Sequence, residues 1–189
     1  MSWAMKGARE VGGHSRKPRV ELVLRNVSAL FNSMDPSPFH EKDLDKDAEE
    51  FIVSWTREFP LATPLTLRIH LHEWPLEEPT VMVREGVHNY FAYRGKLIDS
   101  DFRLLMKQAR TSLLIGLAFL AFCLLTSSYF LADREGTLFR FLRESLTIAG
   151  WVAMWRPMQI YLYDWWPLRR RGQLYGKLSR IPVEVVRKD

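Results

Sequence analysis

Residues 112–132 read SLLIGLAFLAFCLLTSSYFLA, a run of 21 residues without a charged side chain. A helix rises about 1.5 Å per residue, so this run is long enough to cross a hydrocarbon core about 30 Å thick. The alternative is a core helix of a soluble domain, but such a helix normally has a polar face, and this run has none. The sequence therefore predicts a first membrane span over residues 112–132. The mean hydropathy of −0.16 hides this span because it averages the run with a charged N-terminal half.

A second apolar stretch, SLTIAGWVAMWRPMQIYLY, covers residues 145–163 and is also long enough to cross a membrane. It carries Arg156 and Pro157 near its middle, so a re-entrant or interfacial segment is the alternative. Aromatic and then basic residues follow in the order expected where a span meets the cytoplasmic interface: Tyr161, Tyr163, Trp165, Trp166, Arg169, Arg170 and Arg171. We therefore expect a hairpin of two spans joined by a short external loop over residues 133–144, with Trp165, Trp166 and Arg169 to Arg171 as interface anchors.

The basic residues near the membrane ends indicate the orientation of the hairpin. Five precede the first span and five follow the second, whereas the predicted loop holds Arg134, Arg140 and Arg143. The opposite orientation would export residues 1–111 without a signal peptide, which the first 20 residues lack. We expect both termini in the cytoplasm and a multi-pass protein of the cell (inner) membrane.

The charge distribution argues against a nucleic-acid partner. The net charge is +5, but residues 1–111 balance at 16 basic and 16 acidic side chains, and residues 164–189 contribute +4. A basic tail directly after a span is typical of topology and lipid-headgroup contact, so the lipid bilayer is the expected partner of this tail. The single cysteine, Cys123, excludes an intrachain disulfide.

The N-terminal half predicts a small cytoplasmic α/β module over residues 19–80, after a basic segment 1–18 that we expect to be disordered. Residues 20–24 and 65–71 have strand patterns. Between them, Asp45 and Asp47 favour a helix start, with Glu49 and Glu50 in its first turn and Pro60 as its stop. Two strands and one helix make a poor core, so we expect residues 182–186 of the basic tail 164–189 to add a third strand, or a second subunit to supply the packing.

Residues 81–111 have apolar side chains at helical intervals and predict a stalk helix that runs into the first span without a break. The predicted fold is therefore an α+β membrane protein: a transmembrane hairpin, a small cytoplasmic α/β module, and a long helix running into the first span.

Motifs that carry chemistry are mostly missing. The stretch DLDKD at residues 43–47 begins like a calcium loop but lacks its glycine and its bidentate glutamate, so helix capping explains it better. His70 and His72 lie two apart on a predicted strand, with His40 and His88 elsewhere, and a transition metal would need three or four converging ligands. We predict no catalytic residue, cofactor or metal, and we expect these histidines to face solvent or a partner.

Arg156 is the one basic residue inside the predicted second span. A buried arginine costs about 2.5 to 3.5 kcal/mol on insertion scales and often marks a transport pathway. The competing interpretation is that it snorkels to the cytoplasmic headgroups or adjusts to the backbone break at Pro157.

Three segments resemble stretches of an uncharacterised family of small bacterial two-span inner-membrane proteins: PFHEKDLDKDAEEFIVSW at residues 38–55, GWVAMWR at 150–156 and YDWWPLRRR at 163–171. The resemblance implies a bacterial inner-membrane location and carries over no activity or site residue.

We expect a non-enzymatic membrane-anchored adaptor or accessory subunit that meets a protein partner or forms a homo-oligomer through its cytoplasmic module. Two alternatives stay open on the sequence. One is an oligomeric channel or transport component that uses Arg156, and the other is a membrane-bound enzyme that uses His70 and His72.

Overall fold

The computed structural model describes residues 18–38, 42–131 and 136–188. The chain forms two compact units. The first comprises the described residues up to Leu97 together with those from Arg171 onward, and the second runs from Ile98 to Arg170. The basic segment predicted over residues 1–18 lies outside the described residues except for Pro18. The first unit is therefore assembled from both ends of the chain.

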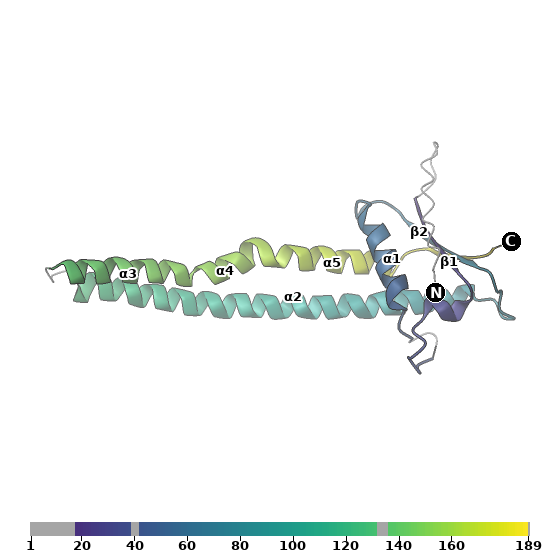
Figure 1. Cartoon of the computed structure of the whole chain (residues 1–189), viewed down its shortest axis with the longest axis horizontal. Coiled ribbons are helices and arrows are strands. Elements are labelled where there is room, and N and C mark those ends of the chain that lie inside the picture. The colour runs from purple at the N-terminus through teal and green to yellow at the C-terminus, as the bar shows by residue number, and fades with distance from the viewer. Residues whose placement is uncertain (1–17, 39–41, 132–135, 189) are drawn as a thin grey trace. The chain divides into compact units, whose positions relative to one another are not determined.

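A parallel sheet of three strands forms the base of the first unit (Figure 1). The strands are β1 (Arg19–Leu24), β2 (Thr66–Leu71) and β3 (Val183–Arg187), in the order β1-β2-β3. The register places Leu67 of β2 beside Val20 of β1 and Val183 of β3. The predicted third strand from the C-terminal tail is thus confirmed, one residue later than expected.

The alternation of apolar and polar residues explains why these segments are strands. In β2, Leu67, Ile69 and Leu71 are at most 1% exposed, and they point to one face. Their neighbours Arg68 and His70 point to the opposite face and are partly exposed. The sheet therefore has one apolar face and one polar face, as the sequence predicts for residues 65–71.

Helix α1 (Lys46–Arg57) connects β1 to β2, after a 3-10 helix, η1 (Val27–Leu30). The Asp45 side chain caps α1 by accepting a hydrogen bond of 3.0 Å from the backbone N–H of Asp47. The helix ends shortly before Pro60, which has no N–H to donate. This helix and its cap are confirmed as predicted.

The core of the first unit also draws on the long helix α2 (Thr80–Leu125) and on α5 (Trp165–Leu178). Val83, Val87 and Phe91 of α2 are at most 1% exposed, and Leu178 of α5 is fully buried. Sequence analysis predicted only a basic tail here, because the arginine run and two glycines of α5 hide its three buried side chains: Leu174, Tyr175 and Leu178. The thin core expected from two strands and one helix is completed within the chain itself.

In the second unit, the helix that begins at Thr80 continues through Leu125 into a π-helical turn, η2 (Thr126–Phe130). This helix is long and apolar enough to cross a membrane. Among the described residues, no other helix meets both conditions. The prediction of a helix that runs unbroken from residues 81–111 into the apolar run is confirmed.

The segment after the long helix begins its helix earlier than predicted and is interrupted near its middle. Helix α3 (Thr137–Ala153) begins within the segment predicted as an external loop over 133–144, of which residues 133–135 lie outside the described part of the chain. The helix predicted over 145–163, with a backbone break expected at Pro157, is interrupted at Met154 and resumes as α4 (Trp155–Gln159) and the π-helix η3 (Ile160–Asp164). The break has a physical cause, because Pro157 cannot donate a hydrogen bond to the carbonyl of Ala153.

Small residues bring α3 against the apolar part of α2, and the two helices run side by side in Figure 1. A Cβ added at Gly150 would lie 2.9 Å from Leu120 Cδ1 and 3.2 Å from Cys123 Cβ. One added at Gly116 would lie 3.1 Å from the carbonyl oxygen of Ala153. The two helices therefore pack closely at these small residues.

Candidate functional site

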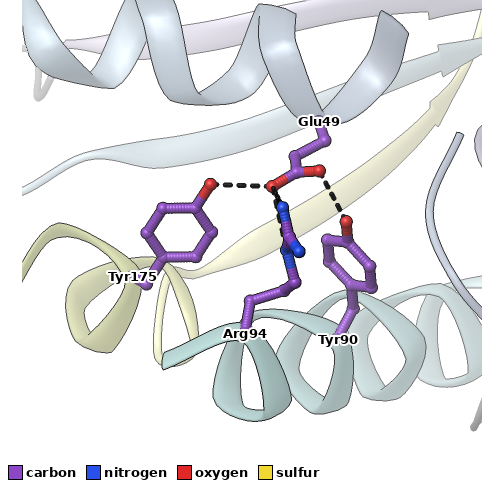
Figure 2. Close-up of polar contacts among 4 residues, drawn as sticks. All are labelled: Glu49, Tyr90, Arg94 and Tyr175. Carbon is purple, nitrogen blue, oxygen red and sulfur yellow. Dashed lines mark hydrogen bonds and ion pairs between the residues drawn. The ribbon is translucent and has the colours of Figure 1, made fainter. Parts of the chain in front are cut away.

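The most developed polar cluster of the first unit is centred on the carboxylate of Glu49 in α1 (Figure 2). Tyr90 of α2 donates its hydroxyl to Glu49 Oε2 at 2.6 Å, and Tyr175 of α5 donates to Oε1 at 2.7 Å. Arg94 lies one helical turn after Tyr90 and donates from Nη2 to the same Oε1 at 3.2 Å. One carboxylate therefore connects three helices, and we call these four residues the Glu49 cluster.

The Glu49 cluster is shielded from water on most sides. The Glu49 side chain is 13% exposed, whereas the Arg94 side chain is 43% exposed. The rings continue into the core, since Phe91 packs edge-on against both Tyr90 and Tyr175 with centroids 5.4 and 5.8 Å apart. The cluster thus forms the polar rim of an aromatic core.

The surroundings of Glu49 decide its protonation state. Burial by itself raises the pKa of this carboxyl, but the hydrogen bonds from Tyr90 and Tyr175 and the positive charge of Arg94 together outweigh it. The net effect is a pKa below the usual glutamate value, so the carboxylate stays ionised near neutral pH. Burial and the bond to Glu49 also raise the pKa of both tyrosines.

Chemically, the Glu49 cluster is suited to holding helices together. Each carboxylate oxygen accepts at least one charge-assisted hydrogen bond, and such bonds are stronger than neutral ones. The tyrosine hydroxyls are protonated donors, which is a structural role and not that of an activated nucleophile. The Glu49 cluster therefore links α1, α2 and α5 through hydrogen bonds to one carboxylate.

Sequence analysis missed this cluster, because it assigned Glu49 to the first turn of a helix. One usable signal was the spacing of Tyr90 and Arg94, four residues apart and hence on one helix face. The contribution of Tyr175 had no local signal, because it comes from 126 residues further along the chain.

The polar face of the sheet carries a second set of charges. Arg68 of β2 donates to Glu184 of β3 at 2.7 Å, and His70 lies 3.8 Å from Glu21 of β1. These pairs span all three strands and remain partly exposed. They make a ridge of alternating charge across the sheet.

The predicted histidines do not converge. His72 is exposed beyond the end of β2, and His88 Nε2 lies 2.7 Å from the backbone carbonyl oxygen of Ile181. His40 lies outside the described residues. Over residues 18–38, 42–131 and 136–188, no three His, Cys, Asp or Glu side chains are grouped in a way that could hold a metal ion.

In the second unit, Arg156 lies on α4 and pairs with Asp164 at the end of η3, with Nη1 and Oδ2 3.5 Å apart. The arginine side chain is 54% exposed. The sequence led us to expect Arg156 to reach the lipid headgroups or to adjust to the break at Pro157, and Asp164, eight residues further along the chain, was not considered.

The predicted interface anchors gather at the start of α5. Trp165 and Trp166 stack edge to face with centroids 5.7 Å apart, and the guanidinium of Arg169 lies 5.8 Å from the centre of the Trp165 ring. Arg170 and Arg171 are exposed. Of these residues, Trp165 contacts both Trp166 and the guanidinium of Arg169, the latter as a cation–π contact.

The comparisons with known proteins give no match: neither a protein-family model, nor a curated protein, nor a solved structure is similar to this chain.

Proposed function

We propose that this protein is a non-enzymatic, membrane-anchored adaptor or accessory subunit, with a cytoplasmic α/β module carried on a two-span hairpin. The observation that carries the proposal is the composition of the first unit, in which β3 and the end of α5 complete a core begun by β1, α1 and β2. The module closes only when the chain returns to it.

This closure supports a second span. The chain leaves the first unit after Leu97 and re-enters it at Arg171. If the apolar helix crosses a membrane, residues 131–170 must cross back, because β3 pairs directly with β2 on the original side. Crossing by the broken segment α3–α4–η3 fits the tolerance of membrane helices for proline where neighbouring groups satisfy the backbone.

The surface of the second unit supports placement in lipid. Many of its large apolar side chains are exposed, and soluble proteins rarely expose so much apolar surface. The examples that are more than 60% exposed and lie in α2, η2, α3 and α4 are Leu104, Leu114, Ile115, Phe122, Tyr129, Phe130, Leu138, Phe141, Ile148, Trp151, Val152 and Trp155. The excess of basic residues before the first span and after the second supports a cytoplasmic module, and the resemblance noted above supports a bacterial inner membrane.

The polar face of the sheet supports the adaptor role. Parallel sheets are usually covered on both faces, whereas here helices pack on one face and the ridge Glu21–His70 and Arg68–Glu184 stays partly exposed on the other. A surface of paired charges held on a rigid sheet is suited to protein recognition, because complementary charges fix orientation and exclude wrong partners.

A cysteine-labelling experiment tests the topology. In a Cys123→Ala background, single cysteines are placed at exposed positions on α1's C-terminal flank (Glu58→Cys), after α5 (Arg180→Cys) and at the start of α3 (Thr137→Cys). Intact cells treated with a membrane-impermeant maleimide are expected to label position 137 and to spare 58 and 180 until the membrane is opened. Labelling of 137 and 180 together in intact cells would overturn the two-span proposal.

Copurification tests the adaptor role. Full-length protein extracted in a mild detergent is expected to bring a different protein in fixed stoichiometry, and Arg68→Glu is expected to reduce its recovery. Glu58→Lys, at the exposed C-cap of α1, is a charge reversal of opposite sign away from the sheet face and should leave recovery unchanged. If no protein copurifies, or if both variants lose it equally, the polar sheet face is not a partner site.

A further inference from the structure

Strand β3 lies at the edge of the sheet, and half of its backbone groups have no strand beside them among the described residues. Leu67 N–H donates to the carbonyl of Pro182, and Lys188 N–H donates to the carbonyl of Leu71. Because a parallel ladder alternates, residues 182, 184, 186 and 188 turn their backbone groups toward β2, and Val183, Val185 and Arg187 turn theirs outward. This outward row is a template for a further strand.

The two edges of the sheet are not equally open. In β1, residues alternate between buried and half-buried, and none is exposed. In β3, Glu184, Val186 and Arg187 are all exposed, and Val186 is an apolar side chain that is 37% exposed. The edge at β3 is therefore the more accessible of the two.

We infer that two copies of this chain pair through β3, antiparallel and about a two-fold axis, so that the two sheets join into one of six strands. A two-fold axis perpendicular to the sheet keeps each face of the sheet continuous across the two copies. Even-numbered residues of one β3 must therefore lie opposite even-numbered residues of the other, and odd-numbered opposite odd-numbered. The axis also requires the outward backbone groups of one copy to meet those of the other, as in the pair Val185 with Arg187 of the second copy.

Charge complementarity selects the register. With Val186 opposite Val186 of the second copy, Glu184 lies opposite Lys188 of the second copy, and the symmetry repeats this ion pair. In the neighbouring register, the two-fold axis passes between Val185 and Val185 of the second copy. Glu184 then lies opposite Val186 of the second copy, and no charges are paired. Opposite charges and apolar side chains directly across strands are stabilising, so the first register is the one that we propose.

A disulfide cross-link tests the contact. In the Cys123→Ala background, Val186→Cys is expected to form a disulfide-linked dimer under mild oxidation, because directly opposed residues of this kind lie about 4.5 Å apart at Cα, within the disulfide range. Val23→Cys, at the same level of the sheet on β1, is the matched control and should remain monomeric. Cross-linking of Val23→Cys alone, or of neither variant, would overturn the inference.

A charge reversal tests the register in the purified full-length chain. Lys188→Glu places like charges opposite each other twice and is expected to weaken dimerisation by roughly tenfold, measured by native mass as a function of protein concentration. Arg187→Glu changes the net charge equally but faces no carboxylate in this register, so about threefold or less is expected. Equal effects of the two variants, or a monomer at every concentration, would refute the pairing. Since both measurements use the purified chain alone, they do not depend on whether a different protein copurifies.

Discussion

The two units of this chain place similar apolar side chains in opposite environments. In the first unit, Phe91 and Leu22 are at most 1% exposed and lie between helices and sheet. In the second, Phe122, Trp151 and Trp155 are 63%, 62% and 74% exposed. The first unit buries its apolar side chains by its own packing, whereas the second unit leaves large apolar side chains exposed.

The contacts that hold each unit together differ accordingly. Burial of apolar area from water drives the first unit, with the Glu49 cluster at its rim. If the second unit lies in a bilayer, as proposed, this drive is absent between its helices, and close packing at small residues such as Gly116 and Gly150 carries more of the association. Substitutions of the same kind should therefore have unequal effects in the two units.

The largest expected difference comes from removing one phenylalanine ring in each unit. Phe91→Ala should cost about 3 to 5 kcal/mol of unfolding free energy, because it leaves a cavity against Tyr90 and Tyr175. Phe122→Ala, at an exposed site, should leave the unfolding of the first unit unchanged. Denaturant unfolding in detergent, followed by near-UV circular dichroism, measures both. Similar losses from the two variants would contradict the proposed division into a water-packed and a lipid-facing unit.

The Glu49 cluster gives the next effect. Glu49→Gln removes the negative charge to which Arg94 and the two tyrosines donate hydrogen bonds. It should lower the unfolding free energy by about 2 kcal/mol at neutral pH. Glu50→Gln, the exposed neighbour in the same helix, is the control and should be nearly neutral.

The same variant predicts a pH dependence. Because folding lowers the pKa of Glu49, the stability that its ionisation supplies is fully present above the ordinary glutamate pKa and is lost as the pH falls through the lowered value. The difference in unfolding free energy between wild type and Glu49→Gln should therefore shrink between pH 7 and about pH 3. A difference that stays constant over this range would show that Glu49 is not held ionised by the cluster.

Two glycines in helices separate packing from helix propensity. Gly116→Ala brings a Cβ to 3.1 Å from the Ala153 carbonyl oxygen and should destabilise the hairpin by about 1 kcal/mol. Gly176 of α5 has nothing within 4 Å of an added Cβ, so Gly176→Ala should stabilise by up to about 1 kcal/mol through helix propensity. Titration with SDS, followed by helical circular dichroism, reports the sign of each change. Stabilisation by both would argue against close helix contact at Gly116.

The smallest effect concerns Arg156. Its pair with Asp164 is long at 3.5 Å and more than half exposed on the arginine side, so Arg156→Leu should change the unfolding free energy by less than about 1 kcal/mol. If the protein is an oligomeric channel, Arg156→Leu should abolish ion flux in reconstituted vesicles, while Arg156→Lys should retain part of it. Absence of flux from wild-type vesicles would remove the channel alternative.

Several features of the fold were predictable because they depend on local patterns. The alternation of residues 65–71, the cap at Asp45 and the uncharged run after Arg110 each lie within a few residues of the structure that they produce. The third strand was predictable by a different argument, since two strands and one helix cannot bury enough apolar surface and the tail offered the missing strand.

The features that sequence analysis missed have weak or distant signals. Helix α5 hides its apolar residues among arginines and glycines. The Glu49 cluster joins residues from α1, α2 and α5, and no window of sequence contains all of them.

The sequence by itself therefore determined the periodic elements, the long apolar helix and the need for a further strand, because hydrophobic period and capping act over one or two turns. Only the tertiary structure decided which carboxylate holds the helices together, which charge Arg156 meets, and which edge of the sheet stays open. Those outcomes depend on residues that are far apart along the chain and meet only when the core closes around them.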